Sequence, residues 1–524
     1  MIEKVKRILG LGSPKTGNKL IISVEKLERR VALLENSRLE EYNVERNTSR
    51  NIVGSVYKGK VKNIEMGLKA MFVDIGFEKN AFLHFWDAIP AALDSGIEEI
   101  DRPKDRRPKK RITAKDIPSI YPVGSDVIVQ VTKGPIGTKG PRVTTNLSFA
   151  GRYLVFMPYS DRSGISRKIE DPKERDRLRK ILRGLEIPEG VGVIIRTVGE
   201  GQRARYFVRD LSVLVEQWAR VEQLIRDEPA PCRVFEEPDL VERTVRDFLT
   251  DEIDEVVCDD QPAIDRMNAM VGQISRRARN RIRLYDGGTP IFETFGVQKQ
   301  IDDAFHRQVW LKCGGYIVID ETEALVAIDV NTGRNKGGRD VEKTILQTNL
   351  EAADEIARQL RLRNIGGLII GDFIDMKSRR DQQAVYALMK ERLKRDKAKT
   401  HVLPLSALGL MEMTRQRAQE SLSDSIYENC PYCQGRGVVK TSMTTSVELH
   451  RTLNTVMRKY QETVHELRII LNPDVLKRLK EEDEEFLIEL ERRYAGRLLF
   501  RGDPSFHHER FVITDAQSGV ELKP

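Results

Sequence analysis

Residues 315–331 read GYIVIDETEALVAIDVN, and from Thr344 the chain continues TILQTNLEAADEIARQLRLRNIGGLIIGDF. Apolar and polar residues alternate in both halves of the first stretch, which predicts a β-hairpin. The first part of the second stretch has apolar residues at helical spacing and predicts an amphipathic helix, and its apolar end at 367–373 predicts a buried strand. The order hairpin, helix, strand implies a right-handed crossover in a mixed sheet, and hence an α/β fold.

Two aspartates end the apolar strands of this region: Asp329 in AIDVNTG and Asp372 in IIGDFIDM. If the crossover makes the strands neighbours, the carboxylates converge at one sheet edge, where α/β sheets usually bind ligands. Converging carboxylates repel, and a hard divalent cation such as Mg²⁺ relieves this while keeping waters for phosphate oxygens. Asn331 is a candidate to hold a water or a phosphate, and Asp375 is a spare ligand. The alternative is that each aspartate only caps a turn or a helix.

Upstream, residues 51–86 alternate in apolar character and are broken by glycines, which predicts a small antiparallel barrel. A hydrophilic stretch at 95–115 is rich in Lys, Arg and Pro and predicts a flexible loop. Residues 125–132, SDVIVQVT, predict the closing strand of the barrel.

Phe72 and Phe82 alternate with lysines in this predicted barrel. Aromatic rings on an OB-type strand face stack on bases while lysines track phosphates. The alternative is that both rings belong to the core. The lysines are Lys58, Lys60, Lys62 and Lys69.

Lys133 and Lys139 lie in a glycine and proline hinge, and Arg196 with Thr197 ends the predicted strand VGVIIRT. A guanidinium fork and a hydroxyl are suited to cradle an anionic group, although the residues alone favour a solvated strand end. The arginine-rich run at 276–283 is either a solvated helix face or a phosphate-tracking surface. Helices are predicted at 172–184, 211–224 and 240–257.

Cys430 and Cys433 form a C-x-x-C motif followed by Gln-Gly-Arg-Gly. Two thiolates on such glycine turns form a knuckle typical of structural zinc, which takes four ligands. The motif supplies two ligands and the chain holds no second C-x-x-C. The simplest way to complete the four zinc ligands is therefore the same motif from another chain. The alternatives are recruitment of His401 or His450, or a redox pair, which is disfavoured because no thioredoxin-like βαβ pattern surrounds the motif.

The chain has 524 residues, a formal net charge of +8 and 40% hydrophobic residues, which predicts a soluble protein of about three or four domains. Its five cysteines are too few and too scattered for a disulfide framework. No apolar stretch approaches the roughly 20 residues of a membrane-spanning helix, and the N-terminus shows no secretory signal. We therefore expect a cytoplasmic protein. Its positive net charge is compatible with an anionic partner.

Four strings, in this order, closely resemble the ribonuclease E/G family of bacterial endoribonucleases: AIDVNTG, TNLEAADEIARQLRLRNIGGLIIGDFIDM, LGLMEMTRQR and CPYCQGRG. The resemblance runs from about Lys19 to the C-terminus and implies an α/β multidomain fold. The implied parts are an RNase H-like subdomain (1–45 and 242–304), an inserted OB-fold RNA-binding barrel (46–145), a 5′-sensor region (146–241), a DNase I-like α/β catalytic subdomain (305–426), a zinc link (427–440) and a small α/β C-terminal domain for oligomerisation (441–524).

Carried over residue by residue, the resemblance makes Asp329 and Asp372 the Mg²⁺ ligands and Asn331 their catalytic partner at the scissile phosphate. It makes Cys430 and Cys433 a Zn²⁺ link shared between two protomers. It also implies RNA contacts by Phe72, Phe82, Lys133 and Lys139, and a 5′-monophosphate pocket of Gly151, Val155, Arg196 and Thr197.

The implied activity is hydrolysis of single-stranded A/U-rich RNA in rRNA processing and mRNA decay, leaving a 5′-phosphate and a 3′-hydroxyl, by a homodimer or homotetramer. The form DVNTG and the ending at Pro524, without a long scaffold tail for degradosome assembly, look more like the ribonuclease G branch than the ribonuclease E branch. The rival hypothesis is a non-catalytic OB-fold and zinc-knuckle RNA-binding factor in translation or ribosome assembly. Such a factor has no reason to place two aspartates at adjoining strand ends.

Overall fold

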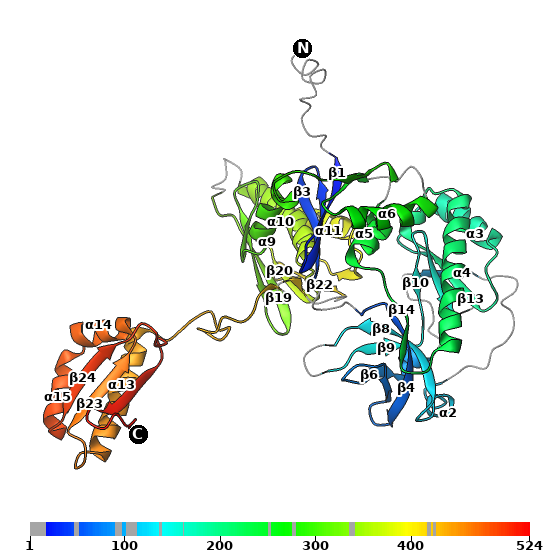
Figure 1. Cartoon of the computed structure of the whole chain (residues 1–524). Coiled ribbons are helices and arrows are strands. Elements are labelled where there is room, and N and C mark those ends of the chain that lie inside the picture. The colour runs from blue at the N-terminus through cyan, green and yellow to red at the C-terminus, as the bar shows by residue number, and fades with distance from the viewer. Residues whose placement is uncertain are drawn as a thin grey trace. The chain divides into compact units, whose positions relative to one another are not determined.

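Figure 1 shows a computed structural model of the whole chain, which forms two compact units, Met1–Ser423 and Asp424–Pro524. Among the helices that are described, none is both long and apolar enough to cross a bilayer. The structure describes residues 17–46, 52–89, 97–100, 113–135, 139–160, 162–249, 253–274, 279–334, 341–416, 421–422 and 426–524.

The first sheet of the larger unit joins the start of the chain to a much later segment. Its elements are β1 (Asn18–Val24), β2 (Glu28–Glu35), β3 (Arg38–Arg46), β15 (Ile253–Cys258) and β16 (Ile282–Leu284), with α5 (Leu240–Phe248), α6 (Gln261–Ile274), α8 (Ile291–Thr294) and α9 (Val297–Ala304). The strand order is β16-β15-β1-β2-β3. β1 is antiparallel to β2 and parallel to β15, with Leu20 opposite Val256. Residues far apart in the chain therefore share one core.

Two predictions in this region are wrong in part. The helix predicted at 240–257 ends at Phe248, because the apolar residues Val256 to Cys258 pair with β1 and β16 as a central strand. The arginine-rich run at 276–283 ends in strand β16, and Arg281 Nη1 donates to Ile253 O at 3.0 Å, whereas Arg279 is helical and 276–278 lie outside the described residues. Pairing with strands distant in sequence overrides the local helical pattern here.

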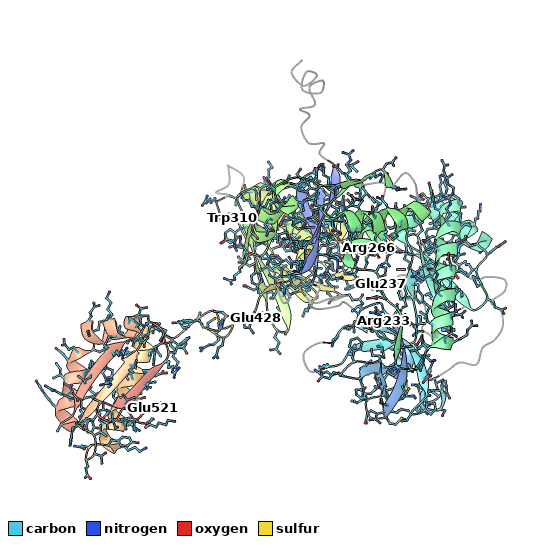
Figure 2. The ribbon with its side chains drawn as sticks, viewed as in Figure 1. Arg233, Glu237, Arg266, Trp310, Glu428 and Glu521 are labelled. Atoms are coloured by element: carbon cyan, nitrogen blue, oxygen red, sulfur yellow. The ribbon has the colours of Figure 1, made fainter. Side chains whose placement is uncertain are left out.

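The second sheet closes into the predicted barrel. Its elements are β4 (Val56–Glu65), β5 (Ala70–Asp74), β6 (Ala81–His84), η1 (Phe85–Ala88), α2 (Ile117–Ile120), β8 (Asp126–Lys133), β9 (Arg142–Thr144) and β14 (Cys232–Phe235). β4 pairs with both β5 and β8, so that β4-β5-β6-β9-β8 form a closed ring. β14, which carries Arg233 (Figure 2), adds to β4 from outside the ring. The barrel and its closing strand are thus confirmed.

The third sheet is covered by two helices. Its elements are β7 (Ile97–Ile100), β10 (Phe149–Ala150), β11 (Leu154–Pro158), β12 (Ser163–Ser166), α3 (Pro172–Gly184), β13 (Val191–Ile195), η2 (Thr197–Gly199) and α4 (Ala204–Asp227). α3 begins where Pro172 follows Asp171, whose side chain accepts from Lys173 N. The prediction of a flexible loop at 95–115 is wrong where β7 pairs with β12, because Ile100 is buried in this core. Residues 101–112 of that stretch lie outside the described residues.

The fourth sheet contains the hairpin, helix and strand predicted from the sequence. Its elements are β17 (Gln308–Trp310), β18 (Tyr316–Glu321), β19 (Leu325–Asn331), α10 (Val341–Leu362), β20 (Gly367–Asp372), α11 (Arg379–Leu393), β21 (Thr400–Val402) and β22 (Leu410–Arg415). The strand order is β17-β18-β19-β20-β22-β21. Ile328 and Ile369 face a core that includes Ile356 of α10 and Met389 of α11. The opposite face, where Asp329 is exposed, is called the open face below.

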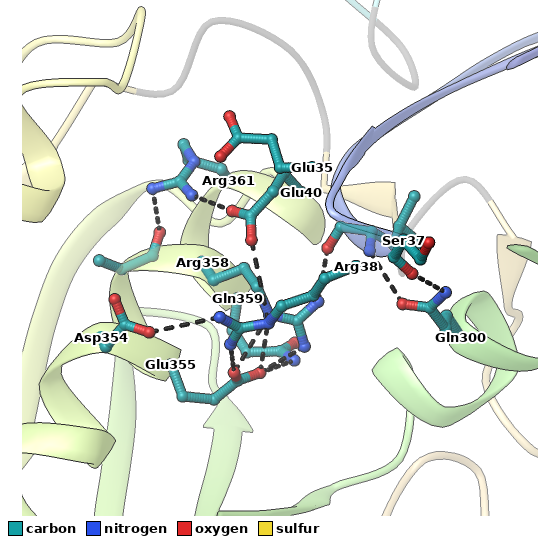
Figure 3. A network of polar contacts seen from close by, with 12 residues as sticks. Glu35, Ser37, Arg38, Glu40, Gln300, Asp354, Glu355, Arg358, Gln359 and Arg361 are labelled. Carbon is teal, nitrogen blue, oxygen red and sulfur yellow. Dashed lines mark hydrogen bonds and ion pairs between the residues drawn. The ribbon is translucent and has the colours of Figure 1, made fainter. Parts of the chain in front are cut away.

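An ion-pair network joins the start of β3 to α10 (Figure 3). Arg38 Nη1 lies 3.3 Å from Asp354 Oδ2, and Arg38 also pairs with Glu355. Arg361 Nη2 lies 2.6 Å from Glu40 Oε2. These contacts fix the first sheet against the helix between β19 and β20, so the two sheets form one body.

The smaller unit is a three-stranded sheet with helices. Its elements are α13 (Ser442–Lys459), β23 (Glu466–Leu471), α14 (Pro473–Glu481), α15 (Glu484–Tyr494), β24 (Arg497–Gly502) and β25 (Phe511–Asp515). The order is β24-β23-β25, with β23 parallel to β24 and antiparallel to β25. Leu449, Leu453, Ile469 and Leu479 fill its core. The finer domain boundaries expected from the resemblance stay predictions.

Candidate active site

Asp329 and Asp372 lie side by side on the open face of the fourth sheet. β19 and β20 are parallel neighbours, and the register places Asp329 directly opposite Asp372. Both residues are exposed. Neighbouring strands are about 4.8 Å apart, so the two carboxylates project together from adjacent strands. The adjacency predicted from the crossover is confirmed.

Within the described residues, no positive charge neutralises this pair. Asn331 Nδ2 donates to Asp329 Oδ2 at 2.6 Å. No ion pair with a lysine or arginine is formed by Asp329 or Asp372 in the described part of the chain. Two like charges at neighbouring positions repel each other. The arrangement therefore favours a bound cation.

The donor atoms suit a hard divalent cation. Mg²⁺ commonly uses one or two carboxylates and keeps several waters, which fits two aspartates beside an amide. The described ranges contain no group of three or more His, Cys, Asp or Glu side chains placed to hold one ion, so Asp375 does not join the pair. It lies against the loop before β22, where a Cβ on Gly409 would be 3.2 Å from Asp375 Oδ1.

A buried asparagine on α10 positions the end of β20. Asn349 Nδ2 donates to Ile374 O at 2.8 Å, and its Oδ1 accepts from Ile374 N at 3.1 Å. This two-point contact fixes the backbone just after Asp372. Sequence reasoning missed Asn349, for which the only signal is a polar residue on the apolar face of the predicted helix.

Phe72 and Phe82 form a cross-strand pair on the outside of the barrel. They lie opposite each other in β5 and β6, with ring centroids 5.9 Å apart and an interplanar angle of 73°. Their neighbours Met71, Val73 and Leu83 fill the barrel interior instead. The alternative that both rings belong to the core therefore does not hold.

The lysines of the barrel region differ in their surroundings. Lys133 and Lys139 flank the connection between β8 and β9, and both are exposed. Lys58 instead donates to Ile225 O at 2.9 Å and to Glu228 O at 2.8 Å, at the end of α4. Lys58 thus holds the barrel against α4, contrary to its predicted place on a phosphate track.

Arg196 lies in a polar corner after β13. Its Nη1 donates to Gly151 O at 2.6 Å, and its Nη2 lies 2.8 Å from Asp247 Oδ1. Thr197 is exposed at the start of η2, and Val155 lies on the neighbouring strand β11, half-buried. The structure therefore brings Gly151 and Arg196 into direct contact, with Thr197 and Val155 close along the same strands.

Asp247 was not predicted as part of this corner. Burial opposes its ionisation, but the positive charges of Arg196, Arg246 and Lys397 outweigh that effect and lower the pKa of Asp247. The carboxylate therefore holds the guanidinium of Arg196 in place. A phosphate group that reached Arg196 would compete with Asp247 for it.

Gly151→Ala is expected to destabilise the larger unit by about 1–3 kcal/mol. A Cβ at this position would lie 2.7 Å from Asp210 Oδ2 and 2.8 Å from Leu214 Cδ1. Asp210 cannot easily move away, because it is buried and accepts from the backbone N–H of Tyr153 and Leu154. Urea unfolding measures the effect. Gly184→Ala is the matched control, since a Cβ there meets nothing within 4 Å, and an equal loss in both variants would contradict the prediction.

Cys430 and Cys433 are free thiols in the loop before α13. Hydrogen bonds from the peptide N–H groups of Cys433 and Tyr432 lower the pKa of Cys430, and Gly437 N donates to Cys433 Sγ at 3.3 Å. The lowered pKa favours the thiolate of Cys430, which is the form that binds zinc. In the smaller unit as described, no further His, Cys, Asp or Glu joins the two thiols in a metal-binding group.

The two histidines considered as further zinc ligands lie elsewhere. His401 belongs to strand β21 of the larger unit. His450 is on α13, where its ring packs against Phe486 with centroids 6.1 Å apart. In the described residues, neither histidine therefore joins the two thiols in a metal-binding group.

The smaller unit does contain a parallel β-α-β arrangement, formed by β23, α14, α15 and β24. The C-x-x-C motif lies in the loop before α13 and outside that β-α-β arrangement, so no such arrangement surrounds it, as predicted. It thus lacks the helix N-terminus that activates redox dithiols.

Comparisons with known proteins match both units. The model of the Ribonuclease E/G family matches residues 148–418, and the model "RNase E/G, Thioredoxin-like domain" matches residues 429–516. "Ribonuclease G" of Escherichia coli (strain K12) is 37% identical over 494 residues, which are 94% of this chain and 99% of that protein. "Ribonuclease G" of Haemophilus influenzae is 36% identical over 495 residues, 94% of this chain and 98% of that protein.

The longer "Ribonuclease E" of Haemophilus influenzae is 37% identical over 507 residues, 96% of this chain and 52% of that protein. The matched regions include the carboxylate pair, the barrel and the C-x-x-C loop. From the family model and these relatives it follows that the chain belongs to the ribonuclease E/G family of endoribonucleases.

Proposed function

We propose that this chain is a Mg²⁺-dependent endoribonuclease that hydrolyses single-stranded A/U-rich RNA in the cytoplasm, in rRNA processing and mRNA decay. The products carry a 5′-phosphate and a 3′-hydroxyl. The observation that carries the proposal is the pair Asp329 and Asp372, in register on an exposed face and without a cation partner in the described residues. A protein that only binds RNA gains nothing from two carboxylates that repel phosphates, so the rival RNA-binding factor is disfavoured.

Each residue of the pair has a defined part in this reaction. Asp329 and Asp372 hold the ion through their carboxylate oxygens, and Asn331 keeps Asp329 oriented through its 2.6 Å hydrogen bond. When bound, the ion supplies positive charge at the scissile phosphate and lowers the pKa of a water molecule. Asn349 keeps the chain after Asp372 in place through its contacts to Ile374. Asp329 and Asp372 are both exposed on the open face, where a single strand would reach them.

The barrel and the third sheet would bind the rest of the RNA. Phe72 and Phe82, outside the barrel core, are proposed to stack on bases, and the exposed Lys133 and Lys139 to contact phosphates. Arg196 and Thr197 are proposed to read a 5′-monophosphate, with Gly151 and Val155 as the wall of the pocket. The contacts of Arg196 to Gly151 O and Asp247 hold it ready for this role.

Cleavage of a short, labelled A/U-rich RNA tests the proposal. We expect cutting that needs Mg²⁺, is confined to the single strand when a duplex of the same sequence is compared, and is faster with a 5′-monophosphate than with a 5′-hydroxyl. Arg196→Gln is expected to remove the preference for the monophosphate without slowing the cutting of 5′-hydroxyl RNA, whereas the exposed Arg220→Gln should change neither. Tight RNA binding by wild type without any cutting would instead favour the RNA-binding factor.

We also propose that Cys430 and Cys433 of two protomers share one Zn²⁺ and link a dimer or tetramer. Cys433→Ser is expected to lower the zinc content from about one ion per two chains to near zero and to shift the protein towards monomer. Elemental analysis with light scattering measures both quantities. Cys313→Ser, which removes a thiol of the fourth sheet region, is the control. A zinc-loaded monomeric wild type would contradict the shared site.

A further inference from the structure

An aromatic row of an exposed tryptophan and a half-buried tyrosine lies beside the carboxylate pair on the open face. Trp310 is the last residue of the edge strand β17 and is 54% exposed, and it lies at the margin of the larger unit in Figure 2. The register places Trp310 opposite Tyr316, and Tyr316 opposite Asn331. The row therefore runs from the sheet edge to the residue that donates a hydrogen bond to Asp329.

The alternation of side chains puts this row on the same face as the carboxylates. Val309, Ile317 and Val330 are the sequence neighbours of the row and pack against the core of the fourth sheet. Successive side chains of a strand point to opposite faces. The residues that project away from the core are therefore Trp310, Tyr316, Asn331, Asp329 and Asp372.

Arg334 lies over the indole ring and is held there by its own backbone. Its guanidinium carbon is 5.4 Å from the centroid of the Trp310 ring, and its N–H donates to Gly314 O at 2.9 Å. The preceding residue, Gly333, has φ 55°, and a Cβ there would lie 2.6 Å from Gly314 O and 3.0 Å from Tyr316 Cδ1. Only glycine permits this close turn, which fixes Arg334 against the row.

Within the described residues, the charge of Arg334 and the ring of Trp310 both stay available. In the described ranges no carboxylate pairs with Arg334. The Trp310 and Tyr316 rings meet at 60° with centroids 5.4 Å apart, an edge contact that orients the indole without covering it. A single exposed apolar side chain needs no explanation. An exposed indole joined to a guanidinium that has no carboxylate partner among the described residues, in register with the proposed catalytic carboxylates, is instead the combination that binds single-stranded nucleic acid.

We propose that Trp310, Tyr316 and Arg334 form a nucleotide subsite for the RNA strand next to the scissile phosphate. A base stacks on the indole, and Arg334 contacts an adjoining phosphate. From the strand spacing and the rise per residue, Trp310 lies about 12 Å from Asp329 along the sheet, which one short single strand can span. Because stacking strength sets such preferences, the subsite favours a purine over a pyrimidine. The inference rests on the proposed function, since it takes Asp329 and Asp372 as the point of cleavage.

Binding is measured with the full-length chain carrying Asp329→Asn and a short 5′-hydroxyl A/U-rich RNA, so that neither cutting nor the 5′-end pocket contributes. Trp310→Ala is expected to weaken binding about tenfold, and Trp310→Leu as much, whereas Trp310→Phe keeps binding within about threefold, because stacking needs an aromatic ring. Arg334→Gln should lower the slope of affinity against salt by about one. Phe486→Ala, which removes a 61% exposed ring of the smaller unit, is the matched control and should change nothing.

Equal affinities of Trp310→Leu, Trp310→Phe and the parent protein would overturn the subsite, and this comparison does not depend on how well Trp310→Ala folds. With Asp329 intact, Trp310→Ala is expected to lose the preference for a purine at one fixed distance from the cut, a change that lower stability alone does not produce. RNA binding that depends on Trp310 in a wild type that never cuts would support the subsite and overturn the nuclease. If wild type cuts RNA and Trp310→Ala gives the same cleavage pattern, the nuclease is supported and the subsite is overturned.

Discussion

Asp329→Asn is expected to reduce Mg²⁺-dependent cleavage by at least about a thousandfold while leaving the metal-free fold at least as stable as wild type. Activity falls because the residue supplies a carboxylate of the proposed ion site. Stability is kept because Asp329 faces Asp372 in register without a cation partner in the described residues, so neutralising one of two like charges relieves repulsion. Cleavage rates and thermal unfolding in the presence of a chelator measure the two effects.

Asp320→Asn is the matched control for this variant. Asp320 lies on β18 of the same sheet, but its carboxylate is paired with Arg307, with Oδ1 at 2.5 Å from Nε. Cleavage should be unchanged, and the loss of an exposed ion pair should cost at most about 1 kcal/mol. Undiminished cutting by Asp329→Asn would remove the carboxylate pair from the mechanism. Strong destabilisation of Asp329→Asn would show that the charge has a structural role.

Arg415→Met is expected to cause the largest loss of stability, about 3–5 kcal/mol. Arg415 ends β22, and its side chain and that of Asp396 are 6% and 2% exposed, with Nε 2.7 Å from Asp396 Oδ2. Its Nη1 also donates to Ile365 O at 2.7 Å. The substitution leaves the buried Asp396 carboxylate without its cation, with only Ala398 N among the described residues still donating to Oδ1 at 2.9 Å, and leaves the Ile365 carbonyl without this donor. Because β22 pairs with β20, we also expect cleavage to fall before global unfolding.

Urea unfolding of the larger unit measures this effect, and two further variants define its cause. Arg307→Met breaks the exposed pair with Asp320 and should leave the free energy of unfolding nearly unchanged. Arg415→Met combined with Asp396→Leu should recover much of the lost stability, because the unpaired buried charge is removed. A double variant as unstable as Arg415→Met alone would show that packing, and not the charge, sets the loss.

The carboxylate pair was predictable because local and long-range signals agree around it. Alternation before Asp329, helical spacing through α10 and the apolar run before Asp372 each indicate the element that forms. Only one arrangement of a hairpin, a helix and a strand brings the two strand ends together. The placement of Phe72 and Phe82 outside the barrel, in contrast, was left open, because alternation alone does not say which face of a barrel strand is inside.

The missed features depend on pairing between distant segments. β7 has four residues, and only its pairing with β12 and the burial of Ile100 distinguish it from the basic stretch that follows. Asp247 pairs with Arg196, which lies 51 positions earlier in the sequence (247 − 196), and no sequence pattern predicts a contact at that separation. Trp310 gave no signal because β17 has three residues, too few for a periodicity. The surroundings of β7, Asp247 and Trp310 form only when the sheets assemble, so the local sequence does not reveal them.

The first sheet also determines the order in which the nascent chain can fold. Asn18 N donates to Asp254 Oδ2 across 236 positions. At the usual rate of translation, β1 is therefore made about ten to fifty seconds before β15. During that interval Leu20 and Ile22 lack the partners that later bury them, whereas the barrel strands from β4 to β9 are made together. We expect the inserted barrel to fold on the ribosome first, while the N-terminal hairpin remains a target for chaperones until β15 emerges.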